Sequence, residues 1–234
     1  MMVSLLWSTL LHCLLVSHDG VAAVIPRPRS PLSLGDTYAS GLLRRCMENV
    51  IDEPTTSFLV SDVQRWSRLG HSTLTWGSGC SGTDMSAFAF DALTSVLSGF
   101  DIDVTFQHEF SAELETKKRD WILALHRPRL LFDDICKLYT HCCSTVHGER
   151  VHPIRDLTDI GIYMAGFVCK SVSNLNTAQS SQAGSACSSA DTLTGFTFHA
   201  TRIFMQRSRP KCVILENVKG IDRDQQLEHV IVWR

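Results

Sequence analysis

The chain has 234 residues, of which 44% are hydrophobic and 20% charged, a balance typical of a globular protein. Its net charge of −2 excludes the strongly basic composition that marks some nucleic-acid-binding proteins. Nine cysteines occur without a C-x-x-C pair, which favours reduced thiols over a disulfide framework.

The N-terminal part is expected to differ from the rest of the chain. Residues 1–40 are predicted to be a leader and linker, because an apolar run is followed by the Pro- and Ser-rich segment VIPRPRSPLSLGDTYAS. The apolar run has the length of a signal peptide but lacks a positively charged start. It is short and interrupted by polar residues, so we expect no stable membrane span. Residues 41–70 are predicted to form a short helical lead-in.

From residue 71 onward, strands and helices are predicted to alternate. Strands are expected at 72–76, 103–109, 129–132, 159–167 and 212–218, and helices at 84–99, 111–126 and 194–206. In the last helix, Phe196, Ala200, Ile203 and Phe204 are expected to share one apolar face. The alternation predicts an α/β fold, namely a Rossmann-like, doubly wound and mostly parallel sheet with helices on both faces.

The ends of the first three strands carry residues suited to an adenosine-like ligand. GSGCSG at 77–82 satisfies G-x-G-x-x-G between a strand and a helix, where backbone can approach a ligand closely. Glu109, placed after the second strand, could accept hydrogen bonds from ribose hydroxyls, and Asp134, after the third, from an adenine amino group. A helix cap at Asp134 and a solvated Glu109 are the structural alternative. The segment HCCSTVH at 141–147 is not predicted to bind metal, because its adjacent cysteines are poorly placed to chelate one ion.

The ends of the fourth and fifth strands suggest a catalytic pair. Cys169 stands where the apolar run of the fourth strand stops, and nearby N–H dipoles could favour its thiolate. A nucleophile needs an assisting group, and Glu216 and Asn217 follow the fifth strand, which is expected to reach the same crevice.

Together these stretches resemble the C5-cytosine-specific DNA methyltransferases, which use S-adenosylmethionine. The glycine cluster is similar to the first motif of that family, and GFVCKSVS resembles its catalytic Gly-Phe-Pro-Cys loop. The segment DTLTGFTFHATRIFMQRSRPKCVILENVKG resembles the family's helix and strand that end in Glu-Asn-Val. The resemblance implies a methyltransferase fold, with S-adenosylmethionine as cofactor, DNA as substrate and no metal.

The resemblance also implies a role for each site residue. Cys169 would attack C6 of a cytosine flipped out of the duplex, Glu216 would hold and protonate N3, and Asn217 would help to fix the loop. The cofactor would be bordered by the glycine motif, with Glu109 on its ribose and Asp134 on its adenine. The residues implied at that motif are Trp76, Gly77, Ser78, Gly79 and Gly82.

Two departures from the family pattern shape the expectation. Val168 stands where the family has proline before the cysteine. The sequence ends at Arg234, before the family's target-recognition region, so residues 71–234 are expected to form a partial catalytic domain, incomplete at its C-terminus and impaired in turnover.

Three alternatives stay open at the level of sequence. They are an RNA cytosine-5 methyltransferase of the same family, a non-catalytic module that keeps only the fold, and a dinucleotide-dependent oxidoreductase, whose glycine motif is similar. The family resemblance implies a nuclear or other intracellular location, which conflicts with the signal-like N-terminus.

Overall fold

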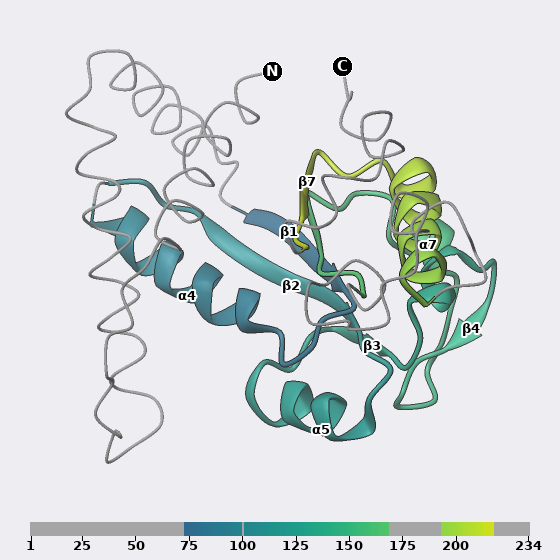
Figure 1. Cartoon of the computed structure of the whole chain (residues 1–234). Coiled ribbons are helices and arrows are strands. Elements are labelled where there is room, and N and C mark those ends of the chain that lie inside the picture. Colours follow the sequence, from purple (N-terminus) through teal and green to yellow (C-terminus); the bar gives the residue numbers. More distant parts are fainter. Residues whose placement is uncertain (1–72, 100, 169–192, 218–234) are drawn as a thin grey trace, which may run out of the picture. The chain divides into compact units, whose positions relative to one another are not determined.

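The computed structural model describes residues 73–99, 101–168 and 193–217 (Figure 1). The expected leader, the helical lead-in and Cys169 lie outside the described residues. The chain divides into two compact units, and the described part of the first comprises 73–74 and 85–107 without residue 100. The second unit contains 75–84 and everything described from residue 108 onward.

Five strands form one sheet in the order β3-β2-β1-β6-β7. The strands are β1 (Thr73–Gly79), β2 (Thr105–Ala112), β3 (Leu130–Phe132), β6 (Ile162–Ala165) and β7 (Cys212–Leu215). The pairs β1–β6, β2–β3 and β6–β7 are parallel. Because the chain moves from β1 outward to β3 and then continues on the other side of β1, the sheet is doubly wound, as the sequence predicts.

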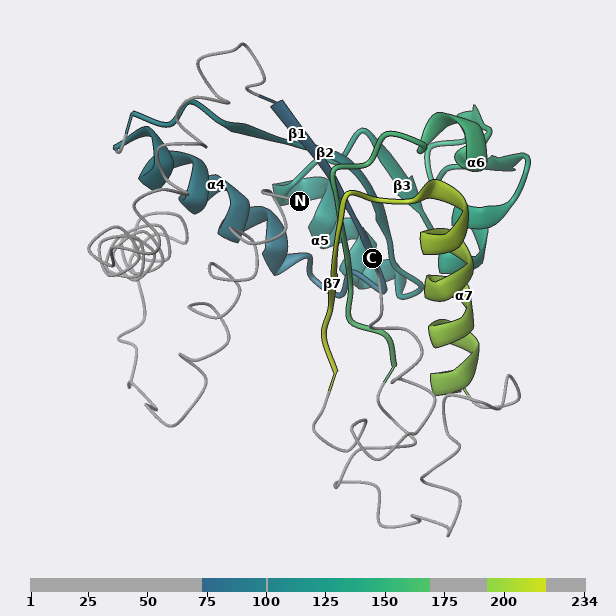
Figure 2. The ribbon, with the colours of Figure 1, turned by 90° about the horizontal axis from the view of Figure 1, so that it is seen from above.

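The helical elements alternate with these strands. They are α4 (Met85–Ser98), α5 (Thr116–Leu125), the 3-10 helix η1 (Ile135–Tyr139), α6 (Pro153–Asp156) and α7 (Leu193–Ser208). A short antiparallel pair of strands, β4 (Cys143–Ser144) and β5 (Arg150–Val151), lies between η1 and α6 in the sequence. Figure 2 shows α7 and β7 running in opposite directions, as a crossover between the parallel strands β6 and β7 requires.

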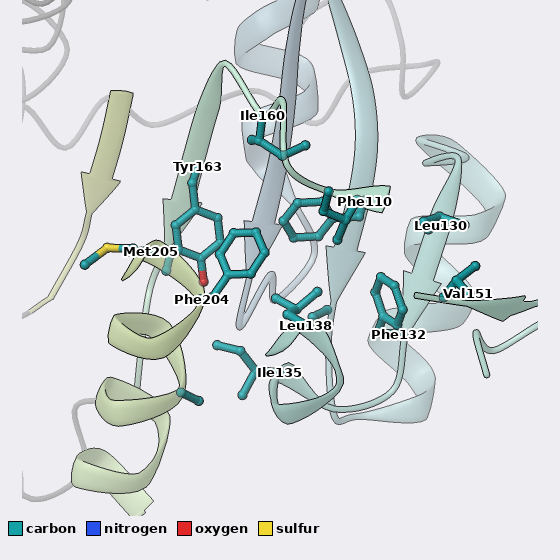
Figure 3. Close-up of a cluster of buried hydrophobic side chains, with 14 residues drawn as sticks. Phe110, Leu130, Phe132, Ile135, Leu138, Val151, Ile160, Tyr163, Phe204 and Met205 are labelled. Carbon is teal, nitrogen blue, oxygen red and sulfur yellow. The ribbon is translucent and has the colours of Figure 1, made fainter. Parts of the chain in front are cut away.

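The core of the second unit lies between the sheet and the helical elements α7 and η1. Phe110 of β2, Tyr163 of β6 and Phe204 of α7 converge there (Figure 3), with the Phe204 ring 5.3 Å from that of Phe110 and 4.6 Å from that of Tyr163. Ala200 also contributes to this core, whereas Phe196 is 42% exposed. The predicted face is therefore wrong in the first two turns of α7, where Thr194, Thr197 and Phe198 are buried instead.

In the first unit, α4 buries Phe90, Leu93 and Val96 along one side. Phe90 stacks on Phe106 of β2 with ring centroids 4.8 Å apart. Both side chains are aromatic, and their contact covers part of the apolar face of α4 with β2.

Two strands extend further than the sequence predicts. β1 continues to Gly79, because Gly77 and Gly79 pair with Tyr163 and Ala165 of β6 and thereby satisfy their backbone groups. β2 continues to Ala112, which pairs with Phe132 of β3. The prediction that β2 ends at Glu109 is therefore wrong, and the first acid beyond the strand is Glu113.

Candidate cofactor and catalytic site

Three strands end at the same level of the sheet. Ala165, the last residue of β6, pairs with Gly79 at the end of β1 and with Leu215 at the end of β7. The order of the strands reverses between β1 and β6, and in such sheets ligands bind beyond the carboxyl ends at this reversal. The segments after β1, β6 and β7 therefore begin beside one another at the candidate site.

The loop after β1 is fastened to the end of β2. The Ser81 amide donates to the Ala112 carbonyl at 3.0 Å, and the Ala112 amide lies 3.1 Å from the Ser81 hydroxyl oxygen that accepts from it. The Gly82 amide donates to the Glu113 carboxylate at 2.7 Å. This loop, which we call the glycine loop (residues 79–84), is thus held by hydrogen bonds to residues about thirty positions later in the chain.

Glu113 is the acid that the structure brings to the glycine loop, and the sequence-based interpretation missed it. Glu113 is only 7% exposed, and its second carboxylate oxygen accepts from the Glu115 amide at 2.9 Å. Glu109, the predicted ribose ligand, lies inside β2 and forms an ion pair with Arg129 at 2.6 Å. No local signal identifies Glu113, because the run Phe110-Ser111-Ala112 becomes a strand through its pairing with β3.

The three glycines of the motif serve different purposes. A Cβ at Gly77 would lie 2.1 Å from the Phe110 ring, and one at Gly79 would lie 2.4 Å from the Tyr163 hydroxyl. Gly77 and Gly79 therefore admit core aromatic side chains against β1. Gly82 has φ of +59°, and a Cβ there would meet no atom of the described residues within 4 Å. Of the three, Gly82 is the one whose surroundings leave room for a ligand.

Trp76 and Ser78, also predicted at the cofactor, are covered by protein. Trp76 is 1% exposed and stacks on His108, with ring centroids 3.7 Å apart and planes 13° from parallel. Ser78 is 3% exposed and its hydroxyl donates to Asp84 at 2.9 Å. Ser78 therefore supports the glycine loop through its hydrogen bonds to Ser81 and Asp84, whereas Trp76 packs against β2.

Asp134 is the N-cap residue of η1. Its Oδ1 accepts from the Cys136 amide at 2.8 Å, which is the capping geometry that the structural alternative describes. Asp134 is half-buried, and its negative charge acts on the pKa of the Cys80 thiol in the glycine loop. Burial, followed by the charges of Glu113 and Asp134, raises the pKa of Cys80 to about 12. The segments after β1, β2 and β3 therefore lie close enough to interact electrostatically.

The segment that leads to Cys169 is held on two sides. Phe167 O accepts from the Asn217 side-chain amide at 2.8 Å, and the Val168 amide donates to the Thr197 hydroxyl at 3.1 Å. The Glu216 amide donates to Ala165 O at 3.0 Å, and a Cβ on Gly166 would lie 3.2 Å from the Glu216 carboxylate. Glu216 is exposed, so its carboxylate can reach a ligand. Glu216 and Asn217 are thus brought together with residues 166–168, whereas Cys169 lies outside the described residues.

Two further properties concern the described part of the chain. The residues that the structure places include no group of three or more His, Cys, Asp or Glu side chains able to hold a metal ion. None of the helices in the same part of the chain has both the length and the apolarity needed to cross a membrane.

The fold and the strand-end residues define an α/β protein whose mostly parallel sheet is consistent with the Rossmann-like methyltransferase fold. Over 152 residues, or 64% of this chain, the sequence is 30% identical to the DNA (cytosine-5-)-methyltransferase DMT5 of Cryptococcus neoformans. The matched region is only 6% of the length of that relative. No protein-family model matches the chain. The resemblance to C5-cytosine methyltransferases is confirmed by this relative.

Proposed function

We propose that this chain binds S-adenosylmethionine at the ends of β1, β2 and β3 and takes part in methylation of cytosine at C5 in DNA. The observation that carries the proposal is the hydrogen bond from the Gly82 amide to the Glu113 carboxylate, beside a position where a Cβ meets no described atom within 4 Å. The similarity to a cytosine-5 methyltransferase supports the same conclusion.

The residues of the glycine loop fit an adenosine-containing cofactor. Each carboxylate oxygen of Glu113 accepts a hydrogen bond from a different backbone N–H, that of Gly82 or that of Glu115. These bonds orient the carboxylate and leave further lone pairs for the two ribose hydroxyls. The exposed Leu114 follows directly and offers apolar surface beside this carboxylate. The half-buried Asp134, capping η1, is proposed to accept from the adenine amino group. S-adenosylmethionine would supply the methyl group.

The chemistry on cytosine is assigned to the other side of the strand reversal. Cys169 Sγ would add to C6, and the electron pair of the C5–C6 double bond would make C5 nucleophilic enough to accept the methyl group. Glu216 would hold the ring and protonate N3 as negative charge develops. S-adenosylhomocysteine would leave as the methyl group is transferred, and the N3 proton would return to the Glu216 carboxylate. Loss of the C5 proton to solvent would then restore the C5–C6 double bond, break the Sγ–C6 bond and regenerate the thiolate.

Asn217 acts on this chemistry through the backbone. Its side-chain amide donates to Phe167 O, two residues before the cysteine, and so limits the movement of the segment that carries Cys169. A base must leave the duplex to be reached, and a fixed loop lowers the entropic cost of aligning the thiolate with C6.

The test is covalent trapping on a duplex that contains 5-fluorocytosine, with S-adenosylmethionine present. The fluorine cannot leave as a proton does, so an enzyme that has transferred the methyl group stays attached. We expect a DNA adduct with the natural chain and none with Cys169→Ser, while calorimetry shows equal binding of S-adenosylmethionine by both. Binding of S-adenosylmethionine without an adduct on DNA would contradict the catalytic part of the proposal.

The same experiment separates the RNA alternative. A 5-fluorocytosine RNA of the same sequence is offered beside the DNA duplex, and an adduct on RNA alone would overturn the choice of DNA. Absence of S-adenosylmethionine binding by the natural chain would overturn the cofactor assignment.

A further inference from the structure

Asp84 is a buried acid at the end of the glycine loop, and the chemistry proposed above makes no use of it. The residue is 1% exposed. Its Oδ2 accepts from the Ser78 hydroxyl at 2.9 Å and from the Ser111 hydroxyl at 2.5 Å, and lies 3.3 Å from His108 Nε2. Burial of a carboxylate is costly unless donors surround it, so an acid here requires an explanation other than packing.

The partners of Asp84 join three parts of the chain. Ser78 belongs to β1, before the glycine loop, whereas Ser111 and His108 belong to β2. Ser111 Oγ and His108 Nε2 are 2.9 Å apart, so the serine oxygen can accept from the imidazole while its hydrogen is donated to Asp84. One carboxylate oxygen therefore connects β1, the end of the glycine loop and β2.

The backbone of the loop depends on such an anchor. Cys80, Gly82 and Asp84 have φ of 52°, 59° and 55°, in the left-handed region that costs energy for residues other than glycine. The Asp84 amide also donates to Ser81 O at 2.8 Å and closes a turn. In the residues that the structure describes, Asp84 Oδ1 has no hydrogen-bond partner, so the hold on the loop is exerted by Oδ2.

The two contacts between the loop and β2 are linked by geometry. Asp84 contacts Ser111, and Gly82, two residues earlier, contacts Glu113, two residues after Ser111. Movement of Asp84 away from Ser111 would therefore displace the Gly82 amide from the Glu113 carboxylate. We infer that Asp84 is a positioning residue, which holds the glycine loop against β2 and thereby orients Glu113 for the ribose of the cofactor. The inference rests on the proposed function.

The test compares Asp84→Asn with Asp91→Asn, which changes an exposed acid on α4 and serves as the control. Asparagine keeps the shape of Asp84 but removes its charge and one of its acceptors. We expect the dissociation constant for S-adenosylmethionine, measured by calorimetry, to rise about tenfold, as for the loss of one hydrogen bond to a charged group. We also expect faster hydrogen exchange at the Gly82 amide. Asp91→Asn is expected to change neither quantity.

A double variant distinguishes positioning from a general loss of stability. If Asp84 acts through Glu113, adding Asp84→Asn to Glu113→Gln weakens binding no further than Glu113→Gln alone. Additive effects would overturn the inference, and so would an unchanged dissociation constant with unchanged exchange at Gly82. Should Asp84→Asn fail to fold, Ser111→Ala removes the same hydrogen bond and is judged by the same criteria.

The result for the natural chain separates this inference from the proposed function. If the natural chain does not bind S-adenosylmethionine, the cofactor assignment fails. Exchange at Gly82 then decides the structural part: faster exchange in Asp84→Asn than in Asp91→Asn supports the anchor, and equal exchange refutes it.

Discussion

The Gly82 amide donates to the Glu113 carboxylate at 2.7 Å, and this hydrogen bond joins the glycine loop to the end of β2. It places Glu113 rather than Glu109 beside the loop, because β2 continues to Ala112, three residues beyond the predicted end at Glu109. Glu109 instead forms an ion pair with Arg129, with 2.6 Å between Glu109 Oε2 and Arg129 Nε.

The first prediction separates the two acids. Glu113→Gln is expected to weaken binding of S-adenosylmethionine about tenfold or more, because the ribose hydroxyls lose a charged acceptor. Glu109→Gln is expected to leave binding unchanged and to reduce the free energy of unfolding by about 1 kcal/mol or less, since Arg129 is 46% exposed on its side chain and solvent screens the pair. Calorimetry and urea unfolding measure the two effects. A larger loss of binding in Glu109→Gln would restore the sequence-based assignment.

The second prediction concerns the close approach of Tyr163 to Gly79. Gly79→Ala would place a methyl group 2.4 Å from the tyrosine hydroxyl and 3.0 Å from Ile135 Cδ1, so we expect a loss of about 1–3 kcal/mol in the free energy of unfolding. In a Tyr163→Phe background the same substitution is expected to cost less, because the nearest clashing atom is gone.

Gly82→Ala provides the matched comparison for that double-mutant cycle. Its Cβ meets no described atom within 4 Å, but φ of +59° costs about 1 kcal/mol for alanine. Tyr163→Phe should therefore give no relief to Gly82→Ala. Equal costs of Gly79→Ala in both backgrounds, measured by urea unfolding, would contradict the contact.

A third prediction tests the hydrogen bond from the Val168 amide to the Thr197 hydroxyl, at 3.1 Å. Thr197→Val leaves this partly buried amide without its acceptor and is expected to cost about 1–3 kcal/mol of stability, whereas Thr197→Ser keeps the hydroxyl. The adduct with 5-fluorocytosine DNA should form more slowly in Thr197→Val, because the segment that leads to Cys169 loses one of its two supports.

Val168→Pro is the control for that experiment. Proline has no N–H, so Thr197→Val should cost little in a chain that already carries Val168→Pro. A full cost in that background would show that the threonine acts through its own helix, where its hydroxyl donates to Leu193 O at 3.0 Å.

The fourth prediction concerns alkaline pH. Burial raises the pKa of the Cys80 thiol from 9.0 to about 12, so between these values the unfolded chain releases a proton that the folded chain retains. Because ionisation then favours the unfolded state, the free energy of unfolding should fall as the pH rises above 9, and less steeply in Cys80→Ser. Urea unfolding at pH 7 and pH 10 measures the difference. Iodoacetamide should also leave Cys80 unlabelled at pH 8 in the folded chain; rapid labelling would contradict the raised pKa.

Much of the fold could be predicted because the apolar runs and the helical periodicity that indicate each element lie within that element. The strand of Cys212–Leu215 and the helix of Leu193–Ser208 show apolar runs and periodicity within a few residues, and both were predicted within two or three residues of their ends. The end of β2 could not be predicted in the same way. Whether Phe110 and Ala112 are strand or helix depends on pairing with Leu130 and Phe132 of β3, which no local pattern reveals.

The sequence by itself determined the α/β class, the alternation of strands and helices, and the positions of the glycine motif and of Glu216 and Asn217. Only the tertiary structure decided which acid meets the glycine loop and why Asp84 is an acid. The reason is that Gly82 and Glu113 are 31 residues apart, and Asp84 and Ser111 are 27 apart. Hydrogen bonds over such separations depend on the register of neighbouring strands, and a shift of one residue would turn these side chains to the opposite face.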